Sequence, residues 1–530
     1  MTRRRFLPLL LALVSMFSAC RQNKRDIVIL FENDVHCAVE TYSRIAGLRD
    51  AALKYTPHVA VVSAGDFIQG DVIGSLSKGE YIIDLMNTVP YDVTTVGNHE
   101  FDYTVARQQW LFDRLTADVV CCNLSTTDGK DLYRPYVIRN YGNRRVAFVG
   151  AATPTTLHSS TPTFFMDSKG QVIYDFHFDD TYTLIEQAAT QARREGADYV
   201  ILLSHLGDDT PIANSMDMIR QTRGIDAVLD GHAHHVLYSQ LPNADGESVW
   251  LLSTGSKGKY IGELHIRPDG TLRPDLIVPD SLAKAHRVEN RIREIEQALA
   301  EQVNQVVGYS EVDLLDRDMQ QQRVVRWQET NLSDWVADAM RVVGGGQIGF
   351  MHGGGLRAPI RKGNITLGDL IAVIPFNNRL AKVEMTGQQL LDAMEVSVVT
   401  YPIESGDFHI GSGLRYSIDP SIPSSVQWDE QNMFAGVGST RRIVKMEVQD
   451  MKTGKWSDIN PKAVYTISGL NYTLLNQGAS GMFRYAKPIP SDDMKDTDIL
   501  LTYLRLLGDT IRAAQYPEDI NEKRFTVVEP

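Results

Sequence analysis

Cysteine is scarce in this sequence, with four residues in a chain of 530. Cys20 ends an apolar leader, so the body of the chain holds an odd number, at Cys37, Cys121 and Cys122. An odd set does not build a paired disulfide framework, and no CxxC pair offers two thiolates to a metal. Cys121 and Cys122 lie in an apparent strand and are expected to be small buried side chains.

Positive charge falls short of negative charge. Lys plus Arg number 53 against 66 Asp plus Glu, which gives a formal net charge of -13. This imbalance excludes broad nucleic-acid binding, because that function needs a basic face. An anionic substrate would have to be captured by a local group of basic side chains, since the net charge repels it.

Long apolar runs are absent beyond the first twenty residues. Hydrophobic residues make up 43% of the chain and charged residues 22%. This composition excludes a disordered chain and a multi-span membrane protein. The chain is also too long for one hydrophobic core, because cores stop growing at roughly 250–300 residues. We therefore expect two large domains.

Residues 1–20 have the pattern of an export signal. Arginines at 3–5 precede an apolar stretch over 6–19, which is too short to span a bilayer but long enough for a signal-peptide core. Ser-Ala-Cys at 18–20 resembles a bacterial lipobox, which predicts acylation of Cys20. We predict an exported protein, periplasmic or on the cell surface, anchored as a lipoprotein. The alternatives are plain secretion with Cys20 near the cleavage site and, for the arginines, either a twin-arginine signal or a general leader.

Five short apolar runs in the first half of the chain each lead into Asp, Asn or His. The runs cover residues 27–31, 59–62, 93–96, 199–203 and 225–229. Their length and β-branched content predict buried strands, and the segments at 104–117 and 181–195 predict helices between them. Alternating strands and helices indicate an α/β domain, in which ligands gather at the carboxyl ends of the strands. We expect the five runs to end at one sheet edge.

The polar residues that follow these runs form a set of nitrogen and oxygen donors. The set is Asp34, His36, Asp66, Asn98, His205, His232 and His234. A set without thiolates suits Mn, Zn, Fe or Co. Seven donors exceed the needs of one tetrahedral ion, so the sequence predicts two divalent ions that share a bridging carboxylate.

The same residues stand in recognisable motifs. They are Asp34-x-His36, Gly65-Asp66, Gly97-Asn98-His99-Glu100-Phe101-Asp102, His205 and Gly231-His232-Ala233-His234. The ordered set resembles calcineurin-type metallophosphoesterases and, among them, the 5′-nucleotidase/UDP-sugar hydrolase family. The resemblance implies an α/β protein with a four-layer α/β/β/α metallophosphoesterase sandwich over 24–280. A linker helix over 281–305 and an α/β 5′-nucleotidase C-terminal substrate-binding domain over 306–527 would follow.

The resemblance also implies a role for each donor. Asp34, His36, Asp66 and His234 would hold one ion. Asp66, Asn98, His205 and His232 would hold the other, with Asp66 as the bridge. His99 would stand beside the scissile phosphate, oriented by Asp102. Two ions lower the pKa of a bound water and so supply hydroxide for in-line attack on phosphorus.

In the second half of the chain, the resemblance rests on residues that would recognise substrate. Its motifs are Val325-Arg326, Gly-Gly-Gly-Leu-Arg at 353–357, Pro-Phe-Asn-Asn at 375–378 and Asn471-Tyr472. It implies that Arg326 and Arg357 contact phosphate or ribose. Phe376 and Tyr472 would stack on a base, and Asn378 would bond the base edge. Stacking of this kind is worth roughly 1–3 kcal/mol per face.

Three positions depart from the family pattern. His352 stands where Asn is usual before the glycines, and Cys37 replaces a common Gly. The segment 476–481, around Ala479, lacks the acid that would bond the ribose hydroxyls. These departures leave the nucleoside selectivity open.

We therefore predict an exported phosphohydrolase that removes the 5′-phosphate of nucleotides with two divalent ions (Mn, Zn, Co or Fe). Its partner would be a nucleotide or related phosphate ester, with no nucleic-acid polymer and no obligate protein partner. One alternative is hydrolysis of cyclic nucleotides, nucleotide sugars or sulfur conjugates within the same superfamily. Another is a non-catalytic surface binding protein that kept the fold. The complete donor set argues against a non-catalytic protein, because a relative that has lost catalysis should also have lost at least one metal-binding residue.

Overall fold

The structure, a computed structural model, describes residues 25–528 apart from 168, 211–212, 321, 430–431, 476–477, 479 and 521–522. The predicted export signal, Cys20 and Ala479 lie outside the described residues. The chain forms two compact units. The first holds residues 25–68, Gly79–Thr156 and Met166–Ile295, and the second holds Gln69–Lys78, Leu157–Phe165 and residues 296–528. Throughout the described part of the chain, every helix is too short or too polar to span a bilayer.

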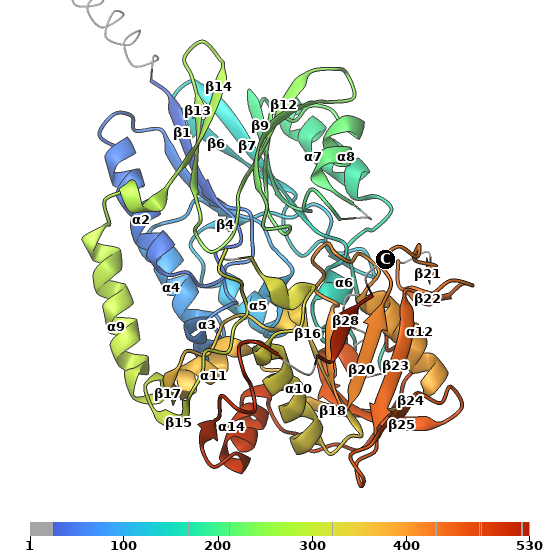
Figure 1. The fold of residues 1–530 in the computed structure, drawn as a ribbon. Coiled ribbons are helices and arrows are strands. Elements are labelled where there is room, and N and C mark those ends of the chain that lie inside the picture. The colour runs from blue at the N-terminus through green and yellow to red at the C-terminus, as the bar shows by residue number, and fades with distance from the viewer. Residues whose placement is uncertain are drawn as a thin grey trace, which may run out of the picture. The chain divides into compact units, whose positions relative to one another are not determined.

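Two six-stranded sheets form the centre of the first unit (Figure 1). The spatial order in one sheet is β14 (Leu272–Ile277), β13 (Ile261–Ile266), β1 (Ile27–Glu32), β2 (Val59–Ser63), β3 (Val93–Thr94) and β4 (Asp118–Val119). β1 pairs in parallel with β2, as do β2 with β3 and β3 with β4, whereas β13 runs antiparallel to β1. The parallel strands therefore bring their carboxyl ends to one edge.

The second sheet is also mixed. Its order is β11 (Val236–Pro242), β12 (Ser248–Thr254), β10 (Ala227–Asp230), β9 (Tyr199–His205), β7 (Arg144–Ala152) and β6 (Tyr136–Tyr141). β7, β9, β10 and β12 are parallel, and β6 and β11 close the two sides in antiparallel pairs. A separate pair of short strands, β5 (Ser125–Thr126) and β8 (Tyr174–Asp175), lies outside both sheets.

The expectation of a single sheet edge is wrong. The runs at 27–31, 59–62 and 93–96 form strands of one sheet, and those at 199–203 and 225–229 form β9 and β10 of the other. Buried strands in both sheets have the same unbroken apolar pattern, so periodicity does not say which sheet a run joins. The strand predicted around Cys121 and Cys122 also ends earlier, at Val119. Cys121 is nonetheless buried.

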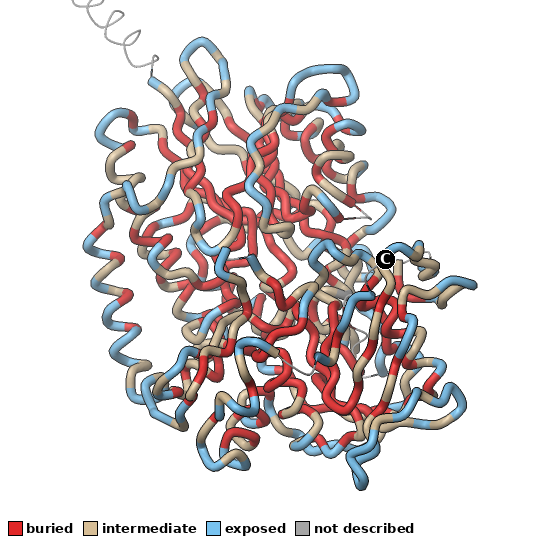
Figure 2. The backbone as a smooth tube through the Cα atoms, viewed as in Figure 1, coloured by how far each residue is buried: buried red, intermediate tan, exposed pale blue. Residues whose placement is uncertain are grey.

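The first unit has the predicted four-layer architecture. Apolar residues of both sheets, such as Phe31 and Phe148, form one buried cluster between them. α2 (Glu40–Ala52) packs on β1 and β2, and α4 (Glu80–Thr88) and α5 (Val105–Phe112) precede and follow β3. α7 (Thr181–Arg194) and α8 (Ser215–Gln221) cover the other sheet, where Ile185 and Met218 enter a further cluster (Figure 1). Figure 2 shows the strands of both sheets as mainly buried.

The second unit contains smaller sheets around a core of its own. The five-stranded sheet has the order β19 (His409–Ser412), β16 (Ile348–His352), β25 (Val464–Leu470), β18 (Leu380–Thr386) and β26 (Lys487–Ile489). A four-stranded sheet has β24 (Trp456–Asp458), β23 (Ile443–Gln449), β20 (Leu414–Ile418) and β28 (Phe525–Val527). The smaller sheets are β17 (Gly363–Thr366), β15 (Val306–Ser310) and β27 (Thr510–Ile511), and the pair β21 (Val426–Trp428) and β22 (Phe434–Val437).

Threonine caps fix where the helices of this unit begin. Thr330, Thr366 and Thr386 each accept a hydrogen bond from a backbone N–H three residues later and complete a capping box. They start α10 (Asn331–Gly344), α11 (Leu367–Val373) and α12 (Gly387–Ser397). The remaining helices of the second half are α13 (Asn471–Leu474), α14 (Asp496–Leu506) and α9 (His286–Val303), which falls within the range of the predicted linker helix. Trp335 of α10 is completely buried in the core.

Two short strips from the first half of the chain belong to the second unit. One is Gln69–Lys78, which begins three residues after Asp66 and contains α3 (Val72–Ser77). α3 packs on α11, and the Ser75 hydroxyl donates to the carbonyl of Pro375 at 2.8 Å. The other strip, Leu157–Phe165, receives the hydroxyl of Tyr472 at its Ser159 carbonyl, 3.5 Å away.

Candidate metal centre and substrate pocket

The seven predicted donors lie where strands of the first unit end. Asp34 and His36 follow β1, Asp66 follows β2, Asn98 follows β3, His205 ends β9, and His232 and His234 follow β10. Five of them, Asp34, His36, Asp66, His232 and His234, have φ between 45° and 78°. Non-glycine residues rarely adopt this left-handed backbone, and such strain concentrates at functional sites. The strand ends of two sheets therefore meet in a strained and specific loop cluster.

Two glycines allow the donor loops to approach one another. A Cβ at Gly97 would stand 2.1 Å from Oδ1 of Asp66, and a Cβ at Gly231 would stand 2.9 Å from Oδ2 of Asp34. A side chain at either position would collide with a donor carboxylate. The glycines of these two motifs are thus a steric requirement of the site.

Asp34, His36 and His234 form a first donor group. Nε2 of His36 lies 3.0 Å from Nε2 of His234. Oδ1 of Asp34 lies 3.4 Å from Nε2 of His234 and 3.8 Å from Nε2 of His36. One atom from each residue thus converges within 4.8 Å of the others, close enough to surround a single cation.

Asp34, Asp66 and His205 form a second group. Nε2 of His205 lies 3.2 Å from Oδ2 of Asp66 and 4.0 Å from Oδ1 of Asp34. Nδ1 of His205 bonds the carbonyl of Ala64 at 2.7 Å, while its Nε2 is buried with no hydrogen-bond partner among the described residues. An imidazole held in this way presents one nitrogen to a metal. The chemistry of the donors therefore fits a divalent cation.

The electrostatics of this group favour positive charge. Burial lowers the pKa of His205, but Asp66 and Asp34 outweigh it and raise the pKa to about 10. Burial lowers the pKa of His232 to about 4, and the charge of His205 acts in the same direction. His232 is therefore neutral, the form in which imidazole binds metals. Its Nδ1 lies 2.9 Å from Oδ1 of Asn98, so these two predicted donors lie together as well.

Two carboxylates lie between the donor groups. Asp34 has an oxygen near histidines of both groups, and Oδ2 of Asp66 lies 3.2 Å from His205 and 3.8 Å from His36. The assignment of Asp66 as the bridge between two ions stays a prediction.

His99 and Asp102 form a hydrogen-bonded pair next to the donors. Nδ1 of His99 lies 2.6 Å from Oδ2 of Asp102, and its ring centroid is 5.2 Å from that of His36. The Asp102 carboxylate accepts a hydrogen bond from Nδ1–H, so Nε2 is the ring nitrogen that can exchange a proton with a substrate oxygen. The predicted helix at 104–117 is shorter, Val105–Phe112, and Thr104 caps it.

Glu100 lies in the same motif and has no role predicted from the sequence. This carboxylate is fully buried and accepts hydrogen bonds from the backbone N–H groups of Asp66, Phe67 and Gly97 at 2.8, 2.8 and 2.6 Å. It ties the loop after β2 to the loop after β3. No local pattern marks this role, because two of its three partners, Asp66 and Phe67, come from a distant segment.

In the second unit, Arg326 is surrounded by other basic groups. Burial lowers the pKa of Arg326 to about 9, and the nearby charges of Arg323 and Arg357 act in the same direction. The guanidinium of Arg357 lies 5.5 Å from the ring centroid of Phe376. A cluster of this kind can attract an anion to an otherwise acidic protein.

The segments that carry Phe376, Asn378 and Tyr472 are joined. The backbone N–H of Arg379 donates to Oδ1 of Asn471 at 2.7 Å, and the N–H of Asn471 returns a bond to the Arg379 carbonyl at 2.8 Å. Asn378 is nearly buried, and its own N–H is bound by Asp496 at 2.8 Å. All five predicted substrate residues thus belong to the second unit, on linked segments.

His352 also has a structural setting that the sequence does not reveal. Its ring contacts Tyr472 at a tilt of 30°, with 5.5 Å between centroids, and His409 at a tilt of 32°, with 5.7 Å between centroids. Burial holds the pKa of His352 well below its usual range, as do the charges of His409 and Arg326. The departure at 352 therefore places a neutral imidazole behind the predicted base-stacking ring.

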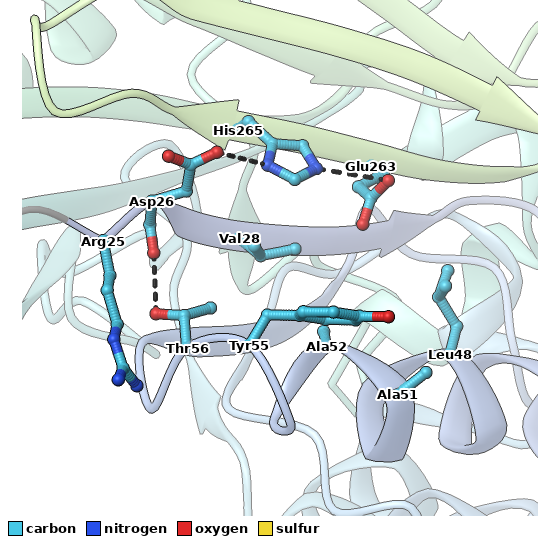
Figure 3. Close-up of a pocket in the computed structure, with 10 residues that line it drawn as sticks. All are labelled: Arg25, Asp26, Val28, Leu48, Ala51, Ala52, Tyr55, Thr56, Glu263 and His265. Atoms are coloured by element: carbon cyan, nitrogen blue, oxygen red, sulfur yellow. Dashed lines mark hydrogen bonds and ion pairs between the residues drawn. The ribbon is translucent and has the colours of Figure 1, made fainter.

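A separate pocket of about 410 Å³ lies at the amino end of β1 (Figure 3). In it, the His265 imidazole bridges the carboxylates of Asp26 and Glu263 at 3.0 and 3.2 Å. The hydrogen bond to Glu263 raises the pKa of His265. Because Asp34 and His36 follow the opposite end of β1, this pocket is not part of the metal centre.

Comparisons with known proteins match both halves of the chain. The profile of the calcineurin-like phosphoesterase family matches residues 27–236, and that of the 5′-nucleotidase C-terminal domain matches residues 306–487. A trifunctional nucleotide phosphoesterase protein from Bacillus subtilis is 25% identical over 92% of this chain and 34% of its own length. This chain thus spans about a third of that relative.

Two further proteins match over most of their lengths. A snake venom 5′-nucleotidase from Crotalus adamanteus is 25% identical, with 75% of this chain and 74% of the venom protein covered. The crystal structure of a 5′-nucleotidase precursor from Thermus thermophilus has a TM-score of 0.78 at 25% identity and covers 95% of this chain and 100% of that one. With both domains matched in this order, the chain belongs to the 5′-nucleotidase family of metallophosphoesterases.

Proposed function

We propose that this protein is a metal-dependent phosphoric monoester hydrolase that removes the 5′-phosphate of nucleotides. The observation that carries the proposal is the convergence of donors around Asp34 and Asp66, with the His99–Asp102 pair beside them. The calcineurin-like fold implies divalent metal ions at this site, and the donor types suit Mn, Zn, Co or Fe. We assign two ions to the site, with Asp66 shared.

Each residue has a defined task in this reaction. Divalent ions lower the pKa of water towards neutrality and offset phosphoryl charge. The Asp102 carboxylate fixes the His99 tautomer and stabilises the charged imidazolium. Nε2 of His99 then donates a proton or a hydrogen bond to the oxygen that departs from phosphorus in an in-line displacement.

Recognition of the nucleotide falls to the second unit. Arg326 and Arg357 would bind phosphate or ribose, and Phe376 and Tyr472 would stack on the base. Asn378 would bond the base edge. The basic cluster and the linked aromatic segments support this assignment.

Phosphate release from purified protein tests the proposal. We expect AMP to be hydrolysed after reconstitution with Mn or Zn, and EDTA to abolish the activity until Mn, Co or Zn is restored. UDP-glucose, cyclic nucleotides and bis-p-nitrophenyl phosphate, assayed in parallel, identify the alternative hydrolase activities. A rate of phosphate release that EDTA does not change would contradict the mechanism. Failure on every ester, with metal bound, would favour the non-catalytic binding protein.

We also propose export and lipid anchoring through Cys20. The support is the leader pattern of residues 1–20. Expression of the full chain in a bacterium fed with labelled palmitate should label the protein, and Cys20→Ser should remove the label. A wild-type protein that is secreted without the label would contradict lipid anchoring and support plain secretion.

A further inference from the structure

We propose that Asn33 is a positioning residue for the metal centre, because its side-chain amide determines which oxygen of Asp34 faces the donor histidines. The inference deepens the proposed function and rests on it, since it concerns the same centre. Asn33 lies directly before the first donor in the chain and has no role predicted from the sequence.

The Asn33 side chain makes four hydrogen bonds in the interior of the first unit. Oδ1 accepts from the backbone N–H of Thr254 at 2.8 Å and from the Thr254 hydroxyl at 2.7 Å. Nδ2 donates to the Gly255 carbonyl and to Oδ2 of Asp34, both at 2.7 Å. Asn33 and Asp34 are both buried, so solvent does not compete for these bonds.

Two of these partners determine which way round the amide lies. A backbone N–H can only donate, and a backbone carbonyl can only accept. The N–H of Thr254 therefore requires Oδ1 on its side, and the carbonyl of Gly255 requires Nδ2 on the other. The hydrogen-bond network thus assigns the Asn33 amide without ambiguity. Its NH₂ group is directed at the Asp34 carboxylate, which accepts from it.

The two oxygens of Asp34 consequently have different surroundings. Oδ2 accepts from the Asn33 amide at 2.7 Å, and the backbone N–H of His232 lies 3.0 Å from Oδ2 and 3.2 Å from Oδ1. Oδ1 receives no bond from the amide. It is the Asp34 oxygen found near the donor histidines, at 3.4, 3.8 and 4.0 Å from Nε2 of His234, His36 and His205. Asn33 therefore occupies one oxygen and leaves the other directed at the histidines.

The same amide joins the two sheets at the metal centre. Asn33 and Asp34 follow β1 of one sheet, and Thr254 is the last residue of β12 in the other. The N–H of Lys257 donates to the Asp34 carbonyl at 2.8 Å, which adds a second contact between these two segments. Hydrogen bonds that orient a metal ligand typically change metal affinity by about 10- to 100-fold when they are removed.

Calorimetric titration of the metal-depleted full chain with Mn²⁺ tests the inference without a substrate. Asn33→Leu is close in size to the wild-type side chain but cannot donate to Asp34. It should weaken binding of the ion at the first donor group by about 10- to 100-fold. Asn33→Ser should weaken it in the same direction, and it provides a second probe should the leucine variant fold poorly.

Thr254→Val is the matched control. It removes the hydroxyl that contacts Oδ1 of Asn33 but keeps the backbone N–H that orients the amide. Its affinity for Mn²⁺ should equal that of wild type. A loss of affinity as large as that of Asn33→Leu would overturn the positioning role, because it would follow from any disturbance of this loop.

Excess metal separates positioning from a general structural role. AMP hydrolysis by Asn33→Leu should be slow at limiting Mn²⁺ and should approach the wild-type kcat at saturating Mn²⁺. A kcat that saturating Mn²⁺ does not restore overturns the positioning role, as does failure of both Asn33 variants to fold.

The titration also separates this inference from the proposed function. Unchanged Mn²⁺ affinity in a folded Asn33 variant overturns the positioning role, even when wild-type protein cleaves AMP. Wild-type protein that binds Mn²⁺ in an Asn33-dependent way but releases no phosphate overturns the proposed activity and leaves the positioning role standing. Wild-type protein that binds no Mn²⁺ overturns both.

Discussion

The backbone N–H of His99 donates a hydrogen bond to Oδ1 of Asp66 at 2.9 Å. Asp66 is the predicted bridge between two ions, and His99 is the predicted proton donor. The other carboxylate oxygen of Asp66, Oδ2, lies 3.2 Å from Nε2 of His205. One carboxylate therefore links the metal centre to the segment that carries the proton-transfer pair, and changes at either residue should have separable effects.

Asp66→Asn should weaken both ions together. The substitution removes one negative charge shared by the two donor groups while the amide oxygen can still accept the His99 N–H. We expect metal content, measured by mass spectrometry after gel filtration, to fall well below that of wild type for both sites. Asp102→Asn is the control, and it should keep its metal. Full occupancy in Asp66→Asn would show that the bridge lies elsewhere, with Asp34 as the next candidate.

His99→Ala should lower kcat by about 10²–10⁴-fold, the usual contribution of general acid catalysis. Metal content should be unchanged, because His99 is assigned no ligand role. Asp102→Asn should give a smaller loss in the same direction, since it disturbs only the tautomer and orientation of His99. Loss of metal from His99→Ala would instead make this residue a ligand.

Phe376→Ala should raise KM for nucleotides by about 5- to 150-fold, the equivalent of roughly 1–3 kcal/mol of base stacking. Hydrolysis of p-nitrophenyl phosphate should be spared, because that substrate has no nucleobase. Leu506→Ala, at an exposed position on α14, serves as the control. Equal losses on both substrates would contradict base stacking and indicate a general structural role next to Arg357.

Asp496 should make the stability of the protein depend on pH. Burial raises the pKa of this carboxyl from 3.8 to about 7. The folded state therefore holds the proton more tightly than the unfolded state. The contribution is complete below about pH 4 and is lost as the pH rises through about 7.

Urea unfolding at pH 5 and at pH 8 measures this effect. Wild-type protein should lose more unfolding free energy between the two pH values than Asp496→Asn, whose side chain does not titrate. Identical pH dependence in both proteins would mean that Asp496 is ionised in the fold throughout this range. The substitution should also loosen Asn378, whose N–H bonds this carboxylate.

Local sequence predicts the α/β fold of the first unit well, for a physical reason. Each predicted donor follows a short apolar run, and Gly97 and Gly231 stand beside carboxylates where a Cβ would collide with them. The family and the two-domain α/β fold are confirmed. The division of the five runs between two sheets is not predictable, because pairing partners such as β1 and β13 are distant in sequence.

The role of a residue that acts through partners distant in the chain cannot be predicted from local sequence. Glu100 lies within a recognised motif, yet its role depends on N–H groups contributed by another loop. His352 is visible as a departure from a pattern, but its tilted ring contact with Tyr472 is a property of the folded chain.

The strips Gln69–Lys78 and Leu157–Phe165 bear on how this protein can be dissected. A fragment that begins at residue 306 would leave both strips behind, and with them α3, which covers α11, and the acceptor of the Tyr472 hydroxyl. The recombinant second half alone should therefore expose apolar surface on α11 and aggregate. Grafting the Gln69–Lys78 helix back through a short glycine-rich linker is the natural remedy for anyone who wishes to study nucleoside binding in isolation.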